Sequence, residues 1–253
     1  MNTPTTVPVV QVHNRDGKGQ VVLICEHASN HIPLEFADLG LADDDRASHA
    51  AWDPGALELS RHLSGALDSV LIAGGVSRLV YDCNRPPDAP SAFPQKTELI
   101  EVSGNRDLSE AEKMRRTALV YEPFCTVVSD AIDMRGPDII VVTVHSFTPI
   151  YFGRPRAVEL GLLHDSDSRL VDAMLENIPQ IPHRVVERNA PYGPEDGVTH
   201  SLQRHALSRG LQNVMIEVRN DLLTSPAMIA QIAQEILTLL EPALEQANTK
   251  ETA

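Results

Sequence analysis

The stretch IIVVTVHSF, residues 139–147, is an almost unbroken apolar run that ends directly in His145-Ser146-Phe147. A run of this length without polar alternation is typical of a strand that is covered by helices on both faces. Two further runs, Val21–Cys25 and Val214–Val218, have the same character. We therefore expect these three runs to form the buried centre of a sheet.

Helical and weaker strand patterns lie between these runs. The helical stretches are Pro54–Leu67, Ser109 to about Asp133 with a kink at Pro123, Asp165–Asn177, and Ser225 to near Pro242. Weaker strand candidates are Val70–Ala73, Arg78–Tyr81, Val158–Leu163 and Arg184–Glu187. The alternation predicts a single three-layer α/β domain over residues 1–253 with a mainly parallel mixed sheet. Residues 1–18 and 246–253 are expected to be peripheral tails.

The composition excludes several classes of protein. The 253 residues include 35 acidic and 21 basic side chains, a net charge of −14, and no basic run. This balance argues against nucleic acid or an anionic membrane as the partner and leaves a small anionic molecule, which would need a local cationic pocket. Three widely spaced cysteines without a CxxC pair predict neither a disulfide framework nor a thiolate zinc site.

The expected location is the cytoplasm. Residues 1–20 show no apolar core of a signal peptide, and no apolar stretch approaches the ~20 residues that span a bilayer. No pattern in the sequence indicates an oligomeric state.

Chemically useful side chains follow the apolar runs. His27 comes just after the first run, His145 follows the second, and Glu217 lies in the third. Ligands of parallel α/β sheets bind beyond the carboxyl ends of the strands. One such histidine alone is more often a hydrogen-bonded core or loop residue. Two imidazoles with a carboxylate favour a site for Zn²⁺ or another divalent metal.

Asp53 is the expected third ligand. It also stands where the N-cap of the Pro54–Leu67 helix belongs, and one carboxylate could serve both purposes. Glu26 and His31 are near enough to His27 to replace it as the ligand. Asn30 is a poor substitute, because a neutral amide oxygen binds Zn²⁺ weakly.

Two other segments carry candidate substrate-binding groups. In Tyr81–Pro87, Arg85 stands before two prolines and could grip a carboxylate in bidentate fashion, with Asn84 as an additional amide donor. A turn with a solvated arginine is the alternative. The Pro- and Gly-rich segment Asn189–Gly197, which includes Tyr192, is typical of loops that cover sites and equally of passive surface loops.

Five segments together resemble the N-formylglutamate amidohydrolase family. They are EHASN (26–30), WDPGA (52–56), DCNRP (82–86), TVHSF (143–147) and IEVRNDL (216–222). The family is similar in fold to the zinc carboxypeptidases and N-acyl-amino-acid deacylases, so the resemblance implies a phosphorylase/hydrolase-like, zinc exopeptidase-like fold. In those relatives a Glu stands three positions after the first ligand His, whereas this chain has Asn30.

The resemblance also implies roles and a reaction. His27 and His145 would be metal ligands, Glu217 the general base, and Asn84 with Arg85 the group that holds the substrate's carboxylate. The expected reaction is metal-dependent hydrolysis of the amide of an N-acyl acidic amino acid, first of all N-formyl-L-glutamate to L-glutamate and formate. Apart from the resemblance, we expect Arg219 or Arg154 to meet a second carboxylate, with a surface salt bridge as the favoured alternative for Arg154, and Tyr192 to contact the substrate.

Three other functions stay open at this stage. They are a zinc deacylase or peptidase acting on another N-acyl amino acid, a metal-free hydrolase that uses the His and Glu groups, and a non-catalytic binding protein on the same fold. Glu217 favours an enzyme, because a binding protein does not need a base at that position.

Overall fold

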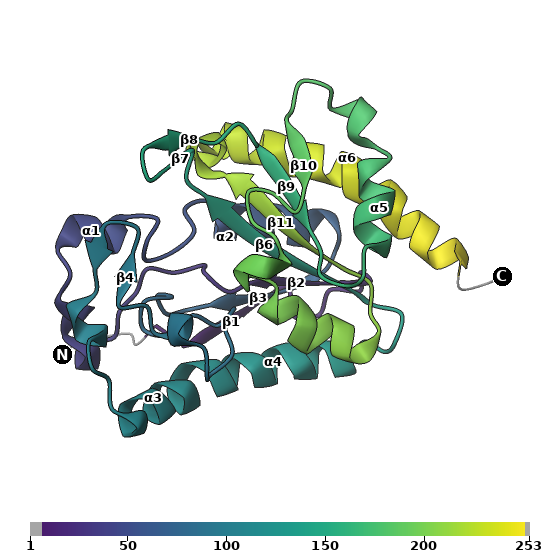
Figure 1. Cartoon of the computed structure of the whole chain (residues 1–253). Coiled ribbons are helices and arrows are strands. Elements are labelled where there is room, and N and C mark those ends of the chain that lie inside the picture. Colours follow the sequence, from purple (N-terminus) through teal and green to yellow (C-terminus); the bar gives the residue numbers. More distant parts are fainter. Residues whose placement is uncertain (1–6, 251–253) are drawn as a thin grey trace, which may run out of the picture.

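One seven-stranded sheet forms the centre of the molecule (Figure 1). The computed structural model describes residues 7–250, with side chains described up to residue 247. The strand order is β1-β3-β2-β6-β11-β9-β10; β1 is antiparallel to β3, β9 is antiparallel to β11, and the other neighbours are parallel. The strands are β1 (Val10–His13), β2 (Val21–Cys25), β3 (Val70–Gly74), β6 (Ile140–Phe147), β9 (Leu160–Leu163), β10 (Val186–Arg188) and β11 (Asn213–Arg219). The expected mainly parallel mixed sheet is confirmed.

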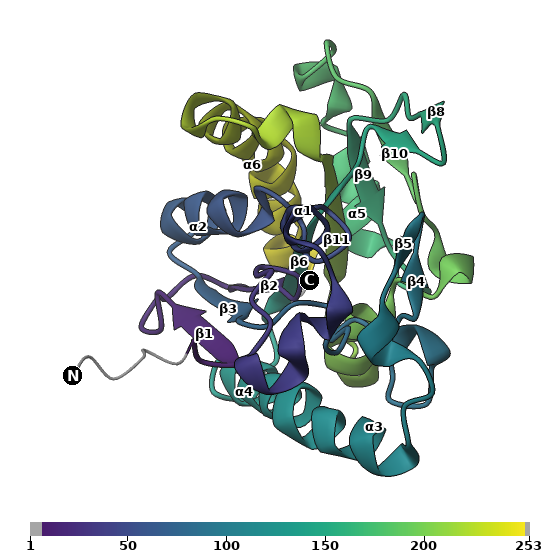
Figure 2. The ribbon, with the colours of Figure 1, turned by 90° about the vertical axis from the view of Figure 1, so that its left-hand side faces the viewer.

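Helices cover both faces of this sheet (Figure 2). Helices α2 (Ala56–Ala66), α5 (Arg169–Leu175) and α6 (Pro226–Lys250) lie on one face, and α3 (Glu110–Arg116) and α4 (Glu122–Asp133) on the other. In β2, Val21, Leu23 and Cys25 pack in the core with α2 and α6, whereas Val22 and Ile24 pack with α4. Since successive strand residues face opposite layers, a strand between two helical layers must be apolar at every position.

Smaller elements surround the carboxyl end of the sheet. Two short antiparallel hairpins stand there, β4 (Lys96–Thr97) with β5 (Ile100–Glu101), and β7 (Ile150–Tyr151) with β8 (Arg154–Pro155). Helix α1 (Asp43–Ala47) lies near β4, apart from the two main helical layers (Figure 1).

The two chain ends differ from the expected peripheral tails. Val10–His13 forms the edge strand β1, so only part of residues 1–18 can be a tail. Helix α6 continues across Pro242 to Lys250, and Ala243, Leu244 and Ala247 are buried. The apolar face continues beyond the proline, and its burial outweighs the lost backbone hydrogen bond.

Three other local predictions need correction. Arg78–Tyr81 is a turn and not a strand. Helix α2 begins at Ala56 instead of Pro54, because Gly55 adopts φ 82° just before it. Pro123 does not interrupt a regular helix, since a π-helical turn over Thr117–Tyr121 precedes it and places it in the first turn of α4.

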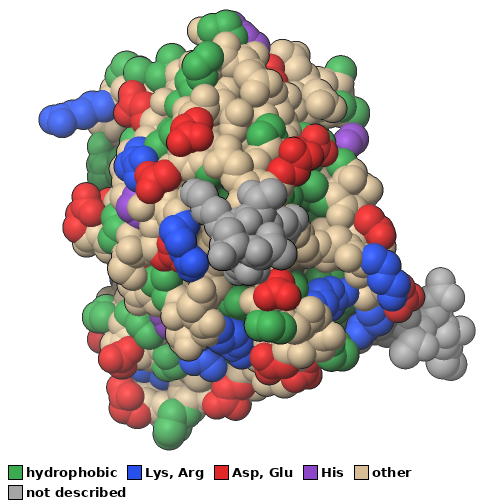
Figure 3. Space-filling view, turned by 90° about the vertical axis from the view of Figure 1, so that its right-hand side faces the viewer, with side chains coloured by type: hydrophobic (Ala, Val, Ile, Leu, Met, Phe, Trp, Pro, Cys, Tyr) green, Lys and Arg blue, Asp and Glu red, His purple; other side chains and the backbone are tan. Residues whose placement is uncertain are grey.

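The surface carries charges of both signs. On the face shown in Figure 3, acidic and basic side chains are interspersed. Among residues 7–250, no helix combines the length and the apolar character that crossing a membrane requires.

Candidate metal and active site

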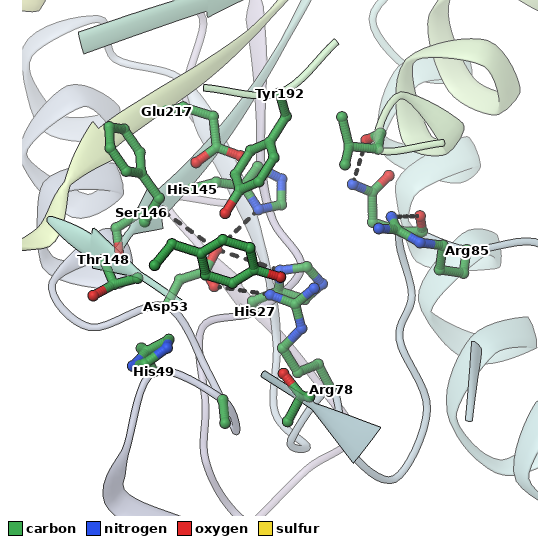
Figure 4. A pocket seen from close by; sticks show the side chains of 16 residues that line it. His27, His49, Asp53, Arg78, Arg85, His145, Ser146, Thr148, Tyr192 and Glu217 are labelled. Atoms are coloured by element: carbon green, nitrogen blue, oxygen red, sulfur yellow. Dashed lines mark hydrogen bonds and ion pairs between the residues drawn. The ribbon is translucent and has the colours of Figure 1, made fainter. Parts of the chain in front are cut away.

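Three side chains that are distant in the sequence meet at the carboxyl end of the sheet (Figure 4). His27 follows β2, His145 lies in β6, and Asp53 lies in the loop before α2. The Nδ1 atoms of His27 and His145 lie 3.3 and 3.0 Å from Asp53 Oδ2, and the ring centroids are 4.9 Å apart. One potential ligand atom from each residue lies within 4.8 Å of the others, and all three residues are buried. This group can hold one metal ion.

The backbone places Asp53 between the two histidines. Its N–H donates to the His27 carbonyl at 2.9 Å, and the Ser146 N–H donates to Asp53 Oδ2 at 3.3 Å. The Ser146 hydroxyl donates to the Pro54 carbonyl at 2.8 Å. The side chain of Asp53 makes no capping bond to α2, so the expected N-cap role is wrong.

A second carboxylate stands behind each imidazole. His27 Nε2 lies 2.7 Å from Asp82 Oδ1, and His145 Nε2 lies 3.2 Å from Glu26 Oε2. Such partners set the tautomer and the orientation of a ligating ring, here with both Nδ1 atoms toward Asp53. Glu26 therefore lies behind a ligand position and not in one. His31 lines a separate surface depression, so neither alternative to Asp53 joins the group.

The electrostatics of the group suit a dication. Burial by itself raises the pKa of the Glu26 and Asp53 carboxyls and lowers that of the imidazoles. The close pairing outweighs burial: the pKa of Asp53 lies well below its usual range, that of Glu26 falls to about 2, and those of His27 and His145 are raised. The protein alone thus balances its carboxylates with protons on the rings. A metal on the Nδ1 atoms would displace those protons, and two imidazoles with one carboxylate are a zinc donor set. The residues fit such an ion.

Arg78 belongs to the site, although the sequence analysis missed it. Its guanidinium lies 3.3 Å from Asp53 Oδ1 and 2.9 Å from Asp82 Oδ2 and so bridges the two carboxylates. A signal was present, since Arg78 is the only charged residue in Val76–Tyr81, and a cation in an apolar stretch usually has a carboxylate partner. The predicted strand over Arg78–Tyr81 concealed it.

Glu217 faces the same space from β11. It pairs in register with His145 of β6 and is buried, and its Oε2 has no hydrogen-bond partner among the described residues. Burial is the main cause that raises the pKa of Glu217 to about 7, with a contribution from Asp53 and opposition from the two imidazoles. A buried carboxyl without a partner is a common mark of a functional site.

A cavity of about 190 Å³ unites these groups. The predicted ligands, the predicted base and the predicted substrate-binding residues line it, except Arg219 and Arg154, together with Arg78, His49 and Tyr151, which were not predicted. The Arg219 guanidinium instead pairs with Asp221 at 2.8 Å and donates to the Arg156 carbonyl at 3.2 Å. Arg219 is therefore not part of this cavity, and its expected contact with substrate stays a prediction.

Asn84 and Arg85 both line the cavity, but they differ in how far their side chains are already bonded to the protein. The Asn84 amide donates to the Val198 carbonyl at 2.6 Å and accepts from the Ser201 N–H at 2.9 Å, so it mainly holds this segment in place. Arg85 donates to the Asn84 carbonyl at 2.8 Å, and no ion pair with it is found in residues 7–250. Of the two, only Arg85 offers an unpaired charge to a substrate.

Tyr192 comes from the loop that was expected to cover the site. Burial and the neighbouring Glu217 raise the pKa of its hydroxyl to about 12. The loop lies tightly against β9: a Cβ on Gly161 would meet the Ala190 carbonyl oxygen at 2.0 Å, so only glycine fits there. The loop thus forms part of the cavity wall.

The sequence model of the N-formylglutamate amidohydrolase family matches residues 19–224. The chain belongs to the N-formylglutamate amidohydrolase family. No protein with a curated description matches this family member.

Two solved structures are similar to this N-formylglutamate amidohydrolase family member. A gene product of Agrobacterium tumefaciens shares 52% identity with a TM-score of 0.93, covering 95% of this chain and 96% of that one. An N-formylglutamate amidohydrolase from Ralstonia eutropha JMP134 shares 21% identity with a TM-score of 0.68, covering 96% and 98%. The second likeness concerns the fold alone.

Proposed function

We propose that the chain is a zinc-dependent amidohydrolase that converts N-formyl-L-glutamate to L-glutamate and formate. Membership of the family supports the reaction class. The observation that carries the proposal is the shared cavity, in which the His27–Asp53–His145 group, the unpartnered carboxyl of Glu217 and the unpaired Arg85 face one another.

His27, Asp53 and His145 would hold the ion, which would be zinc or another divalent metal. When bound, it would supply a water of lowered pKa and polarise the scissile carbonyl. Asp82 and Glu26 would keep the rings oriented through their contacts with the Nε2 atoms. Arg78 holds Asp53 and Asp82 and places a positive charge on the cavity wall.

Glu217 would move the proton. Its carboxyl lines the cavity and has no hydrogen-bond partner at Oε2, so it can accept a proton from the attacking water and then return it to the nitrogen of the leaving amine. Burial among β-sheet neighbours excludes bulk water from this carboxyl and gives it one defined direction, into the cavity.

Arg85 would bind one carboxylate of the substrate. A guanidinium offers two parallel N–H donors to a carboxylate, and its charge is needed in a chain of net charge −14. Tyr192, at the cavity wall, would pack against the bound substrate.

The setting we propose is a reduced cytoplasm and a small anionic substrate. All three cysteines are free and buried, as expected of a protein that does not rely on disulfides.

A substrate panel tests the proposal. Release of the free amino acid is measured with N-formyl-, N-acetyl- and N-succinyl-L-glutamate, before and after chelation and after addition of zinc. We expect cleavage of the N-formyl compound, loss with chelator and recovery with zinc. A preference for another acyl group would indicate a different deacylase, full activity in chelator would exclude the metal mechanism, and binding without turnover would indicate a binding protein.

A further inference from the structure

Two cations near the cavity are left without a carboxylate partner. Arg78 is neutralised by Asp53 and Asp82. Arg85 is one unpaired cation, and Arg156 is the other, since no ion pair with Arg156 occurs in the described part of the chain. In a strongly acidic protein, two unpaired guanidinium groups at one cavity need an explanation.

Arg156 is held against the cavity wall by aromatic rings. Its guanidinium carbon lies 4.4 Å from the ring centroid of Tyr151, 4.8 Å from that of Tyr192 and 5.5 Å from that of Phe147. One guanidinium nitrogen donates to the Thr148 carbonyl at 3.4 Å. All four of these partners line the cavity, and Arg156 packs against them without being part of the lining itself.

This arrangement positions the charge and leaves its donors available. Aromatic faces attract a cation without accepting its N–H bonds in the way a carboxylate does. A guanidinium has five N–H donors, and the contacts of Arg156 with the Thr148 carbonyl and the Tyr192 hydroxyl leave most of them available. The backbone N–H of Arg156 donates to the Pro149 carbonyl at 2.8 Å, which fixes the chain below the side chain.

Arg156 and Arg85 belong to different walls. Figure 4 shows Arg85 at one side of the cavity and Thr148, the contact of Arg156, at the other, with His27 and Asp53 between them. A molecule whose amide lies at the His27–Asp53–His145 group would therefore have one cation on each side. The two carboxylates of a glutamate moiety diverge from the same carbon chain and match such a pair.

We propose that Arg156 is a specificity-determining residue that binds the side-chain carboxylate of the substrate's amino acid, while Arg85 binds its α-carboxylate. The inference rests on the proposed function and assigns to Arg156 the role expected of Arg219. Arg219 is two residues beyond Glu217 and pairs with Asp221, whereas Arg156 reaches the wall from the β7–β8 hairpin.

The test compares three substrates in the metal-loaded full chain. N-formyl-L-glutamate has both carboxylates, N-formyl-L-glutamine lacks the one on the side chain, and N-formyl-L-isoglutamine lacks the α-carboxylate. Arg156→Gln should lower kcat/KM for N-formyl-L-glutamate about 10- to 100-fold, the usual worth of a hydrogen bond to a charged group, and leave that for N-formyl-L-glutamine nearly unchanged. Arg156→Lys should recover part of the preference, and Arg85→Gln should remove the preference over isoglutamine instead.

Arg61→Gln is the control, since Arg61 is exposed on α2 and pairs with Glu58. It should leave all three values unchanged. An equal loss on glutamate and glutamine substrates in Arg156→Gln would mean that Arg156 only supports the wall and would overturn the inference, as would an unchanged preference. A wild-type protein that cleaves none of the three compounds would instead overturn the proposed function itself.

Discussion

Two clusters of buried charge in this molecule are built in opposite ways. In the first, on the α3 side of the sheet, the buried guanidinium of Arg116 donates to Asn105 Oδ1 at 2.7 Å, Glu112 Oε1 at 3.0 Å, and the carbonyls of Gly104 and Val80 at 3.3 and 3.4 Å. Each nitrogen of the guanidinium has an acceptor. A buried charge loses its hydration, and hydrogen bonds from all of its polar atoms are needed to offset that cost to the stability of the fold.

The second cluster, at the cavity, is unevenly satisfied. Asp53 Oδ2 lies within 3.3 Å of both His Nδ1 atoms and the Ser146 N–H, while Glu217 Oε2 has no hydrogen-bond partner among residues 7–250. Hydrogen bonds are thus unevenly distributed at the cavity: Asp53 has several close partners and Glu217 Oε2 has none. Such a distribution is typical of a functional site, where a bound metal and a substrate would supply the remaining contacts.

The largest effect is expected for Glu217→Gln. The amide cannot take up the proton, so kcat for N-formyl-L-glutamate should fall about 10²- to 10⁴-fold. Metal content, measured by mass spectrometry, and the free energy of unfolding should not decrease, since the carboxyl has no hydrogen-bond partner to lose. A nearly normal kcat would remove Glu217 from the mechanism.

Arg116→Met should lower the stability of the fold and leave activity unchanged, the opposite of Glu217→Gln. Removing the central partner leaves buried acceptors unpaired, and the free energy of unfolding in urea should fall by about 3 kcal/mol, while kcat of the folded protein is unchanged. Arg115→Met is the control: Arg115 pairs with Glu112 and Glu35 on the surface, so its loss should cost under about 1 kcal/mol. Equal losses in the two variants would contradict the contrast between the clusters.

Asp82→Asn tests the partner behind His27. An amide orients the ring less firmly than a carboxylate, so zinc affinity, measured by competition with a chelator, should fall about 10- to 100-fold. Asp88→Asn, at an exposed position of the same segment, should bind zinc normally. If Asp82→Asn also binds normally, the 2.7 Å contact with Nε2 does not support metal binding.

The smallest effect concerns pH. Hydrogen bonds from Arg115, and then from Arg116, lower the pKa of Glu112 from 4.5 to about 2 despite its partial burial. A depressed pKa stabilises the fold above pH 4.5, and this contribution is lost as the pH falls from 4.5 toward 2. Glu112→Gln should lack that part of the pH dependence, worth under about 1 kcal/mol for so exposed a pair. If the free energies of unfolding of the wild type and Glu112→Gln change equally with pH across this range, Glu112 does not contribute to the pH dependence.

The buried centre of the fold follows from the sequence alone. The apolar runs in β2, β6 and β11 are continuous because both faces of these strands are covered, and that property is local to each strand. His27, His145 and Glu217 were predicted for the same reason, because the position of a residue in or just after an apolar run can be read directly from the sequence. The capping bond from the Glu112 N–H to Ser109 Oγ also follows from neighbouring residues.

The partners of those residues depend on how the elements pack in three dimensions. Asp53 rather than Glu26 faces both imidazoles, because the loop before α2 is bonded to the ends of β2 and β6. Arg156 packs against aromatic side chains that line the cavity, whereas Arg219 pairs with Asp221. The contacts of Asp53 with His27 and Ser146 join residues 26 and 93 positions apart. Their geometry is set by how strands and loops pack against one another, and no local pattern of residue types encodes that packing.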